Sequence, residues 1–264
     1  MSEVALYSDD CLTVMRGMAD KSVDLTVTSP PYDNLREYGN HEWQFETVAE
    51  QLFRLTKDGG VVIWVVGDAV VGGSESGTAF RQALLFMDIG FRLHDTMIFA
   101  KNVSSLPDPT RYFQSFEYMF VLSNGRPKTF NPIDDKERKW FGRSGLTKKR
   151  HTNGDIELYE RDPEKQSNRR GNIWTYDVGF NKSTTYAPAF EHPATFPEKL
   201  AYDHIVSWSN KGDVILDPFA GSGTTLVACI QSDRNGIGIE VHPPYFEIAK
   251  KRIEQAQLQV RMPI

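Results

Sequence analysis

Two short turns hold the side chains that could perform chemistry. The first, here called the proline turn, is Thr28-Ser-Pro-Pro-Tyr32 at the end of an apolar segment. Its paired prolines fix two φ angles and remove two N–H donors, so the turn would aim the Ser29 side chain, the neighbouring carbonyl groups and the Tyr32 ring at one fixed point. Taken alone, Pro-Pro-Tyr is more typical of a turn that merely ends a strand, and a functional interpretation depends on the second turn.

The second turn, here called the glycine turn, is Asp217-Pro-Phe-Ala-Gly-Ser-Gly-Thr-Thr225. Its small residues would let a ligand approach the backbone, and a helix beginning near Thr224 would point amide N–H groups into a crevice at the carboxyl end of a sheet. The absence of a Gly-Lys-Ser/Thr ending argues against a P-loop for nucleotide phosphates. Glu240 ends the next predicted strand, where such folds place an acceptor for ribose hydroxyl groups.

Short apolar segments predict the strands that would position these turns. They are residues 23–28, 60–66, 213–217 and 236–240, and helices are predicted over 225–233 and 244–260. Apolar runs that end in turn-forming residues and alternate with helices indicate an α/β fold, with a doubly wound and mostly parallel sheet. Trp64 lies within one of these strands and is expected to pack in the core.

Residues 124–185 have a different character from the rest of the chain. This stretch is too long for a structureless loop in a compact domain, so we expect a small inserted lobe. Between residues 136 and 150 there are seven basic side chains and one glutamate, although the whole chain has a net charge of −5. The segregated charge predicts a lobe that faces phosphates, and the alternative is a solvated loop that keeps the protein in solution.

The composition excludes several classes of protein. The chain has 264 residues, 40% of them hydrophobic and 25% charged, with only two cysteines. Two thiols cannot form a disulfide framework, and no Cys or His spacing predicts a metal site. The longest apolar run, 61–66, is far shorter than the ~20 residues of a membrane helix. Together with a polar amino terminus, these features predict a cytoplasmic protein with no membrane partner.

With both turns considered together, the sequence resembles the S-adenosylmethionine-dependent DNA amino-methyltransferases, which methylate an exocyclic nitrogen of cytosine or adenine. The proline turn matches the family's Asp/Asn/Ser-Pro-Pro-Tyr/Phe motif, and the glycine turn matches its cofactor motif. Residues 8–25 and 192–200 resemble the segments that accompany these motifs. The catalytic motif precedes the cofactor motif, as in the class called beta. The resemblance covers most of the chain and implies a Rossmann-like methyltransferase fold with permuted motif order.

The resemblance also implies a division of the chain and a role for each part. Residues 1–123 would be the catalytic half, 124–185 the target-recognition insertion and 186–264 the cofactor-binding half. Ser29 and the Pro30 carbonyl would accept hydrogen bonds from the target amine, and Tyr32 would stack on a base flipped out of the duplex. The implied catalytic residues are Ser29, Pro30, Pro31 and Tyr32.

The implied cofactor site binds S-adenosylmethionine. Asp217 would hold the glycine turn or approach the methionine amino group, Glu240 would accept from the ribose, and Asp10, chosen over its neighbour Asp9, would accept from the adenine amino group. The whole implied set is Asp10, Thr28, Phe196, Asp217, Pro218, Phe219, Ala220, Gly221, Ser222, Gly223, Thr224 and Glu240. DNA phosphates would be contacted from within the set Lys139, Arg143, Lys148, Lys149 and Arg150.

Several alternatives remain at the level of sequence. Cytosine N4 is favoured over adenine N6 because Ser precedes the two prolines, although a serine hydroxyl is a neutral acceptor that suits either amine. Methylation of cytosine C5 is disfavoured because neither Cys11 nor Cys229 follows a proline. A dinucleotide oxidoreductase would need a third glycine after Gly223. A catalytically silent nucleic-acid-binding protein of the same fold is the remaining rival. Implied partners are double-stranded DNA, a second copy of the chain and a cognate restriction endonuclease.

Overall fold

The computed structural model describes residues 2–31, 44–102, 110–137, 145–160, 167–178 and 197–261. The chain forms two compact units, which are described separately below. The first consists of Met1–Asn131 and Asn172–Ile264, and the second of Pro132–Gly171.

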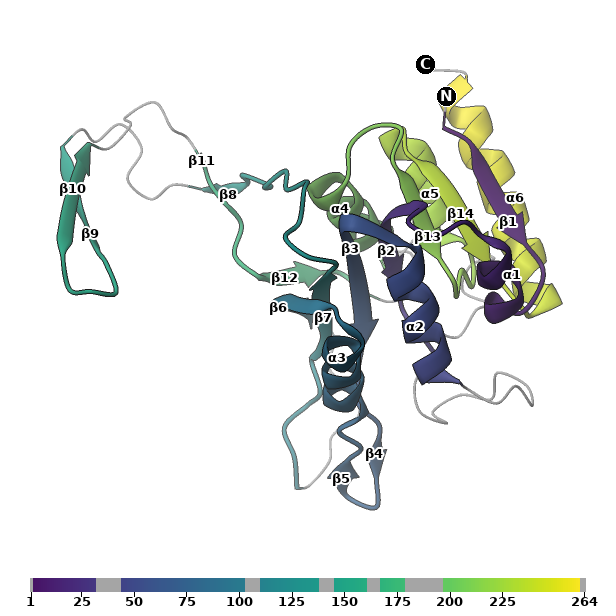
Figure 1. Ribbon diagram of the computed structural model, residues 1–264, viewed down its shortest axis with the longest axis horizontal. Helices are drawn as coiled ribbons and strands as arrows, with labels where there is room; N and C mark the ends of the chain where they lie inside the picture. The colour runs from purple at the N-terminus through teal and green to yellow at the C-terminus, as the bar shows by residue number, and fades with distance from the viewer. Residues whose placement is uncertain are drawn as a thin grey trace. The chain divides into compact units, whose positions relative to one another are not determined.

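The first unit is built around one mixed sheet whose strands follow the order β1-β14-β13-β2-β3-β7-β6-β12 (Figure 1). Neighbouring strands of this sheet are parallel except where β7 pairs antiparallel with β3 and β6. The strand bounds are β1 Val4–Tyr7, β2 Val23–Thr28, β3 Thr56–Val66, β6 Arg92–Lys101, β7 Phe116–Ser123, β12 Ile173–Tyr176, β13 Val214–Asp217 and β14 Asn235–Ile239. A short hairpin joins β4 (Val70–Val71) to β5 (Ser74–Glu75).

Helices cover both faces of the sheet, which confirms the doubly wound α/β class. One group packs as α1 against α2 and α2 against α3, and the other as α4 against α5 and α5 against α6 (Figure 1). The first group comprises α1 (Cys11–Gly17), α2 (Phe45–Leu55) and α3 (Thr78–Ile89), and the second α4 (Glu198–Trp208), α5 (Thr224–Ser232) and α6 (Pro243–Arg261).

The predicted elements are present with small shifts of their ends. Strand β2 has the predicted bounds, whereas β3 begins at Thr56, because this chain segment already pairs with β2 at Val23 before the apolar run starts. Trp64 is fully buried, as expected, and its indole N–H donates to Gln82 Oε1 at 2.8 Å, which satisfies its polar atom in the core. Strands β1, β6, β7 and β12 complete a sheet of which sequence analysis identified only the middle strands.

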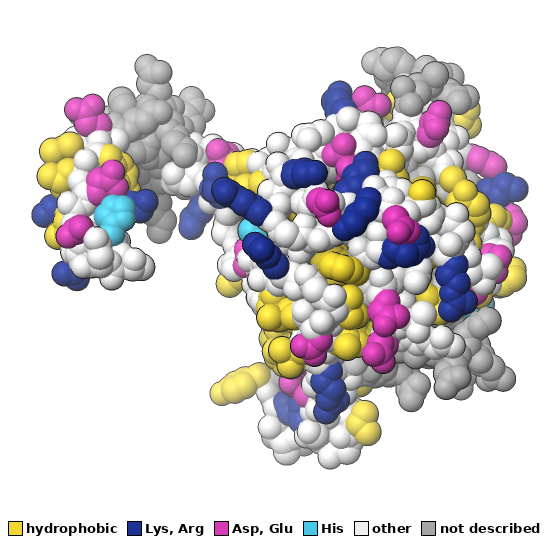
Figure 2. Space-filling view, viewed as in Figure 1, with side chains coloured by type: hydrophobic (Ala, Val, Ile, Leu, Met, Phe, Trp, Pro, Cys, Tyr) yellow, Lys and Arg dark blue, Asp and Glu magenta, His cyan; other side chains and the backbone are white. Residues whose placement is uncertain are grey.

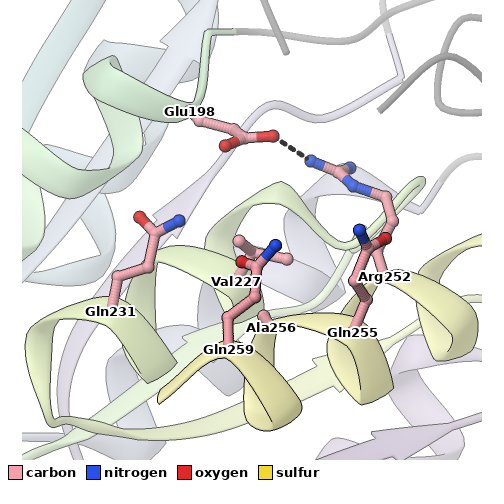
Figure 3. A pocket seen from close by; sticks show the side chains of 7 residues that line it. All are labelled: Glu198, Val227, Gln231, Arg252, Gln255, Ala256 and Gln259. Atoms are coloured by element: carbon pink, nitrogen blue, oxygen red, sulfur yellow. Dashed lines mark hydrogen bonds and ion pairs between the residues drawn. The ribbon is translucent and has the colours of Figure 1, made fainter. Parts of the chain in front are cut away.

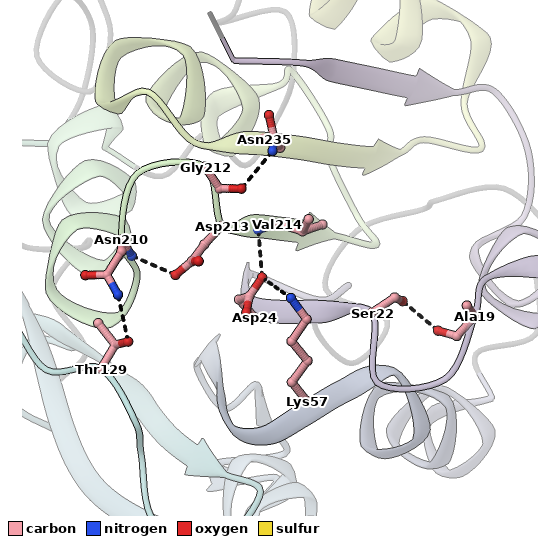
Figure 4. A network of polar contacts seen from close by, with 10 residues as sticks. All are labelled: Ala19, Ser22, Asp24, Lys57, Thr129, Asn210, Gly212, Asp213, Val214 and Asn235. Carbon is pink, nitrogen blue, oxygen red and sulfur yellow. Dashed lines mark hydrogen bonds and ion pairs between the residues drawn. The ribbon is translucent and has the colours of Figure 1, made fainter.

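A network of polar contacts ties the strands together at the ends opposite the two turns (Figure 4). Asp24 Oδ2, next to the start of β2, accepts from Lys57 Nζ at 2.6 Å and from the Val214 amide at 2.9 Å. Asn210 then donates to Thr129 Oγ1 at 3.1 Å from the loop before β13. These contacts link β2, β3 and β13 at the end of the sheet that carries no candidate site.

The second unit contains two short antiparallel ribbons. Strand β8 (Lys136–Glu137) pairs with β11 (Ser167–Asn168), and β9 (Leu146–Arg150) pairs with β10 (Ile156–Glu160). The unit is shorter than the predicted insertion of residues 124–185. Asn131 donates to the carbonyl groups of Val206 and Ser209 at the end of α4, and β12 joins the main sheet, so both flanks of the stretch belong to the first unit. Within the described residues, no helix is long and apolar enough to span a membrane.

Candidate active site at the carboxyl ends of β2, β13 and β14

The proline turn and the glycine turn lie side by side. Strands β2 and β13 are adjacent and parallel, with Leu25 opposite Ile215 and Thr26 opposite Leu216. At their carboxyl ends, Thr28 Oγ1 donates to Asp217 Oδ1 at 2.7 Å across 189 positions of sequence. Both groups are buried, so this hydrogen bond is shielded from water. The proline turn and the glycine turn therefore meet at the carboxyl ends of two adjacent strands.

Asp217 is the buried centre of this junction. It is 1% exposed and accepts from the Phe219 amide at 3.1 Å as well as from Thr28. Thr225 lies in the first turn of α5, and its hydroxyl donates to the Val27 carbonyl of β2 at 3.2 Å. Burial raises the pKa of Asp217 to about 6, because desolvation outweighs the hydrogen bonds that favour its charged form.

The backbone of the glycine turn differs from the sequence-based expectation. Its amide N–H groups were expected to point into a ligand crevice, but several of them donate within the protein. The Ala220 amide donates to the Ile239 carbonyl at 2.9 Å, the Gly223 amide to the Ala220 carbonyl at 2.7 Å, and the Gly221 amide to Glu240 Oε2 at 2.8 Å. Because these three amides donate within the protein, they are not available to bind an anion.

Gly223 has a structural reason for being glycine. It is the N-cap of α5 with φ of 81°, in the left-handed region that favours glycine. A Cβ atom there would lie 3.0 Å from the Ala249 Cβ of α6. The Gly223 position is therefore explained by helix packing, and close approach of a ligand is not needed to account for it.

Glu240 and Asp10 are two further carboxylates near Asp217, at the carboxyl ends of the neighbouring strands β14 and β1. Glu240 follows β14, is 8% exposed, and accepts from the His242 amide at 2.8 Å through its second oxygen. Burial raises the pKa of Glu240, and these backbone hydrogen bonds oppose the shift. Asp10 follows β1 and caps helix α1, where its Oδ1 accepts from the Leu12 and Thr13 amides. Three neighbouring strands thus end in acceptor-rich acidic groups, an arrangement suited to a ligand that is rich in donors and positively charged.

The structure describes only part of the predicted catalytic turn. Ser29 and Pro31 are half-buried, and Pro30 is buried at the start of the turn. Tyr32 and Phe196 lie outside the described residues. Among the other predicted cofactor residues, Pro218, Ala220, Ser222 and Thr224 are buried, whereas the half-buried Phe219 ring packs edge-on to Trp64 with centroids 6.3 Å apart.

Arg252 is a residue of this site that sequence analysis missed. This α6 side chain is 3% exposed, and its Nη1 donates to the Ser222 carbonyl at 2.6 Å and to the Thr224 hydroxyl at 3.2 Å. Its Nη2 donates to Glu198 Oε1 of α4 at 2.7 Å (Figure 3). The guanidinium thus supports the glycine turn from behind. The available sequence signal was a charged residue within the apolar stripe of α6, four positions after Ile248.

A polar hollow of about 110 Å³ lies next to this ion pair, between α4, α5 and α6. Its other lining side chains are mostly amides, from Gln231, Gln255 and Gln259 (Figure 3). These side chains come from helices that cover the sheet. The hollow is therefore a feature of the helical layer and holds none of the predicted catalytic side chains.

The two thiols are unsuited to nucleophilic chemistry. Burial raises the pKa of Cys11 to about 12, with the Asp10 charge adding to the shift, and burial likewise raises the pKa of the deeply buried Cys229. Both are protonated at neutral pH. Among the described residues, no group of His, Cys, Asp and Glu side chains could hold a metal ion.

The basic residues of the β9–β10 ribbon in the second unit lie on two different faces. Opposite residues of an antiparallel pair share a face, so Lys148 and Arg150 lie with Leu158 and Ile156. Lys149 lies on the other face, directly opposite Glu157. All three basic side chains are exposed. Lys139 and Arg143 lie outside the described residues.

The chain is similar to DNA methylases in sequence and in fold. Residues 23–251 match the DNA methylase family. The orphan methyltransferase M.BamHII of Bacillus amyloliquefaciens is 48% identical over 240 residues, covering 90% of this chain and 91% of that protein. Type II methyltransferase M.Cfr9I of Citrobacter freundii is 27% identical, covering 96% and 89%. The cytosine-N4-specific PvuII DNA methyltransferase shares the fold with a TM-score of 0.72 at 19% identity, covering 98% of this chain and 93% of that one.

Proposed function

Because the chain belongs to the DNA methylase family, as an amino-methyltransferase of the beta class, we propose that it methylates the exocyclic N4 of cytosine in double-stranded DNA. The observation that carries the proposal is the Thr28–Asp217 hydrogen bond, which joins the catalytic motif to the cofactor motif at one edge of the sheet. The serine before the two prolines supports cytosine, and adenine N6 is the alternative.

The residues at this edge fit S-adenosylmethionine. This donor carries a sulfonium, an ammonium group and the two hydroxyl groups of its ribose, and the carboxyl ends of the strands offer the carboxylates of Asp10, Asp217 and Glu240. When bound, S-adenosylmethionine supplies an electrophilic methyl group. Glu240 would accept from the ribose with the lone pairs that its two backbone hydrogen bonds leave, and Asp10 would accept through the oxygen that does not cap α1.

The proline turn would prepare the target amine for attack. The lone pair of an exocyclic amine is delocalised into the ring, so acceptors that draw on its N–H bonds favour a pyramidal nitrogen. The Ser29 hydroxyl and the carbonyl of the buried Pro30 would serve as these acceptors, and Tyr32 would stack on the base once it has left the duplex. Holding the two reactants in line then lowers the barrier by proximity.

The second unit would contact DNA through one face of its β9–β10 ribbon. Lys149 lies directly opposite the acidic Glu157, whereas Lys148 and Arg150 share a face with apolar residues. We therefore expect Lys148→Ala and Arg150→Ala each to weaken DNA binding and to reduce the slope of log affinity against log salt by about one. Lys149→Ala is the matched variant, with a smaller expected loss. Equal losses in all three variants would contradict this assignment.

The product of the reaction tests the proposal most directly. Unmodified DNA is incubated with the protein and tritiated S-adenosylmethionine, digested to nucleosides and analysed by mass. N4-methyldeoxycytidine is expected, N6-methyldeoxyadenosine would establish the alternative base, and DNA binding without methyl transfer would favour a catalytically silent protein. Ser29→Ala should lower kcat on the order of 100-fold with KM for the donor unchanged, by analogy with the loss of one stabilising hydrogen bond. Ser22→Ala, at the opposite end of β2, should retain the wild-type kcat.

A further inference from the structure

The β9–β10 ribbon of the second unit carries large aliphatic side chains on its surface. Ile156 and Leu158 of β10 are 57% and 54% exposed. Among the described strands, β9 and β10 pair only with each other, so no wider sheet accounts for these residues. Exposed apolar side chains that cluster in this way mark an interaction site more often than scattered single residues do. Ile156 and Leu158 are therefore candidates for contact with a partner.

One face of the ribbon has a basic row beside this apolar row. Arg150 lies directly opposite Ile156, and Lys148 lies directly opposite Leu158. Opposite residues of an antiparallel pair share a face, with Cβ atoms about 4.5–5.5 Å apart, so β9 contributes two cations and β10 two aliphatic groups. Glu160 also lies on this face, at the end of the ribbon away from its turn. Figure 2 shows hydrophobic and basic side chains on the surface of the second unit.

The opposite face of the ribbon has charges of both signs. Lys149 lies opposite Glu157, whose Oε2 is also 2.9 Å from His151 Nε2. A face of mixed charge is poorly suited to a row of phosphates. The face with Lys148 and Arg150 is therefore the one that complements DNA.

We propose that this face enters the major groove of the target DNA, where Ile156 and Leu158 contact thymine methyl groups while Lys148 and Arg150 contact phosphates. The major groove, about 12 Å wide, admits a two-stranded ribbon, whereas the minor groove is only about 6 Å wide. The thymine methyl is the apolar group that base pairs present in the major groove, so aliphatic side chains there select A·T pairs. This inference rests on the proposed function and adds to it a part of the recognised sequence.

The spacing of the two aliphatic side chains matches the spacing of bases. Residues two positions apart on a strand are separated by about 6.6 Å, and successive nucleotides of one DNA strand by about 3.4 Å along the helix axis. When the ribbon follows the groove, Ile156 and Leu158 therefore reach thymines two base-pair steps apart. The recognition sequence should then contain two A·T pairs separated by one base pair.

Replacing thymine with uracil in the DNA tests the proposal without changing the protein. A·U pairs keep the hydrogen bonds of A·T pairs and lack only the methyl group. Unmodified DNA of one sequence is prepared with either base, and the rate of methyl transfer is measured at DNA concentrations below KM. Loss of one methyl contact corresponds to about fourfold in affinity, so the uracil DNA should be methylated about 15-fold more slowly. Equal rates for the two DNAs would overturn the proposal.

Alanine variants assign the effect to the two side chains. Ile156→Ala and Leu158→Ala should each reduce the ratio of the thymine rate to the uracil rate from about 15 to about 4, because each removes one of two contacts. Tyr159→Ala is the matched control, since Tyr159 follows Leu158 on β10 and is 46% exposed but lies on the other face. This variant should keep the full ratio. Equal ratios in Leu158→Ala and Tyr159→Ala would overturn the assignment.

Binding measured without S-adenosylmethionine separates this inference from the proposed methyl transfer. Competition between the two DNAs should favour the thymine DNA by a similar factor. A preference for thymine DNA without any methyl transfer would contradict the proposed function and support the role of the ribbon. Methyl transfer without any preference would overturn the role of the ribbon and leave the proposed function intact.

Discussion

Replacing Thr28 with valine removes the hydrogen bond that joins the two turns and leaves the shape of the side chain almost unchanged. The hydroxyl donates to Asp217 Oδ1 at 2.7 Å, and the carboxyl is 1% exposed, so water cannot readily replace the lost donor. A hydrogen bond to a charged group contributes about 1.5–3 kcal/mol, and a neutral one about 1 kcal/mol. The free energy of unfolding should therefore fall by about 2 kcal/mol at pH 8, where Asp217 is ionised, and by less at pH 5.

Thr26→Val is a matched control on the same strand. Thr26 lies two residues before Thr28 on β2 and is equally buried, but its hydroxyl has no hydrogen-bond partner among the described residues. Its replacement removes a buried polar atom without breaking a hydrogen bond, so the free energy of unfolding should stay the same or rise.

Thr28→Val should also change the pKa of Asp217. The Thr28 hydroxyl favours the charged form of Asp217, so Thr28→Val should raise the pKa of this carboxyl above about 6. If the ionised form binds the positively charged donor, the loss of donor affinity on acidification should begin at a higher pH in this variant. Urea denaturation at pH 8 and 5 and calorimetric titration with the donor measure both effects. Equal unfolding free energies for Thr28→Val and Thr26→Val at pH 8 would refute the reasoning.

Three further predictions also concern the first unit. Arg252→Met should raise KM for S-adenosylmethionine by about tenfold, because the glycine turn loses the hydrogen bonds that support it. Arg252→Lys should raise this KM less, because it keeps the positive charge. Initial-rate kinetics measure both KM values, and equal values in the two variants would contradict the prediction. The native carboxyl of Asp217 releases its proton near pH 6 and an unfolded one near 3.8. The free energy of unfolding of the wild type, minus that of Asp217→Asn, should therefore be greatest below about pH 4 and fall by about 3 kcal/mol by pH 7. Urea denaturation measures this difference, and a difference that does not change with pH would contradict the prediction. Gly238→Ala would place a Cβ 2.4 Å from Leu226 Cδ1 and should lower the free energy of unfolding by about 1–3 kcal/mol. Gly17→Ala is the control and should not lower it, because nothing lies within 4 Å of the added atom. Thermal melts compare the two variants, and equal melting temperatures would contradict the prediction.

The sequence alone determined the local elements of the sheet and the type of each turn. The bounds of β2 and the glycine turn before α5 follow from apolar runs that end in Pro, Gly and Asp, since these residues act through backbone dihedrals and hydrogen bonds of their immediate neighbours. The order of the two motifs was likewise sufficient to indicate the beta class. Each motif is contained in a short window of the chain, and the order of the two motifs is read directly along the sequence.

Only the tertiary structure decided which groups meet. The Thr28–Asp217 contact, the support that Arg252 gives the glycine turn, and the internal use of the turn's amides all join residues that are distant in sequence or whose partners depend on the order of strands. The exposure of Phe80, Leu84 and Met87 on α3 was also not predictable, because an apolar residue in a sequence does not reveal which side of its helix the sheet will cover. Strand order and burial result from the summed packing of the whole chain, and no local window carries that sum.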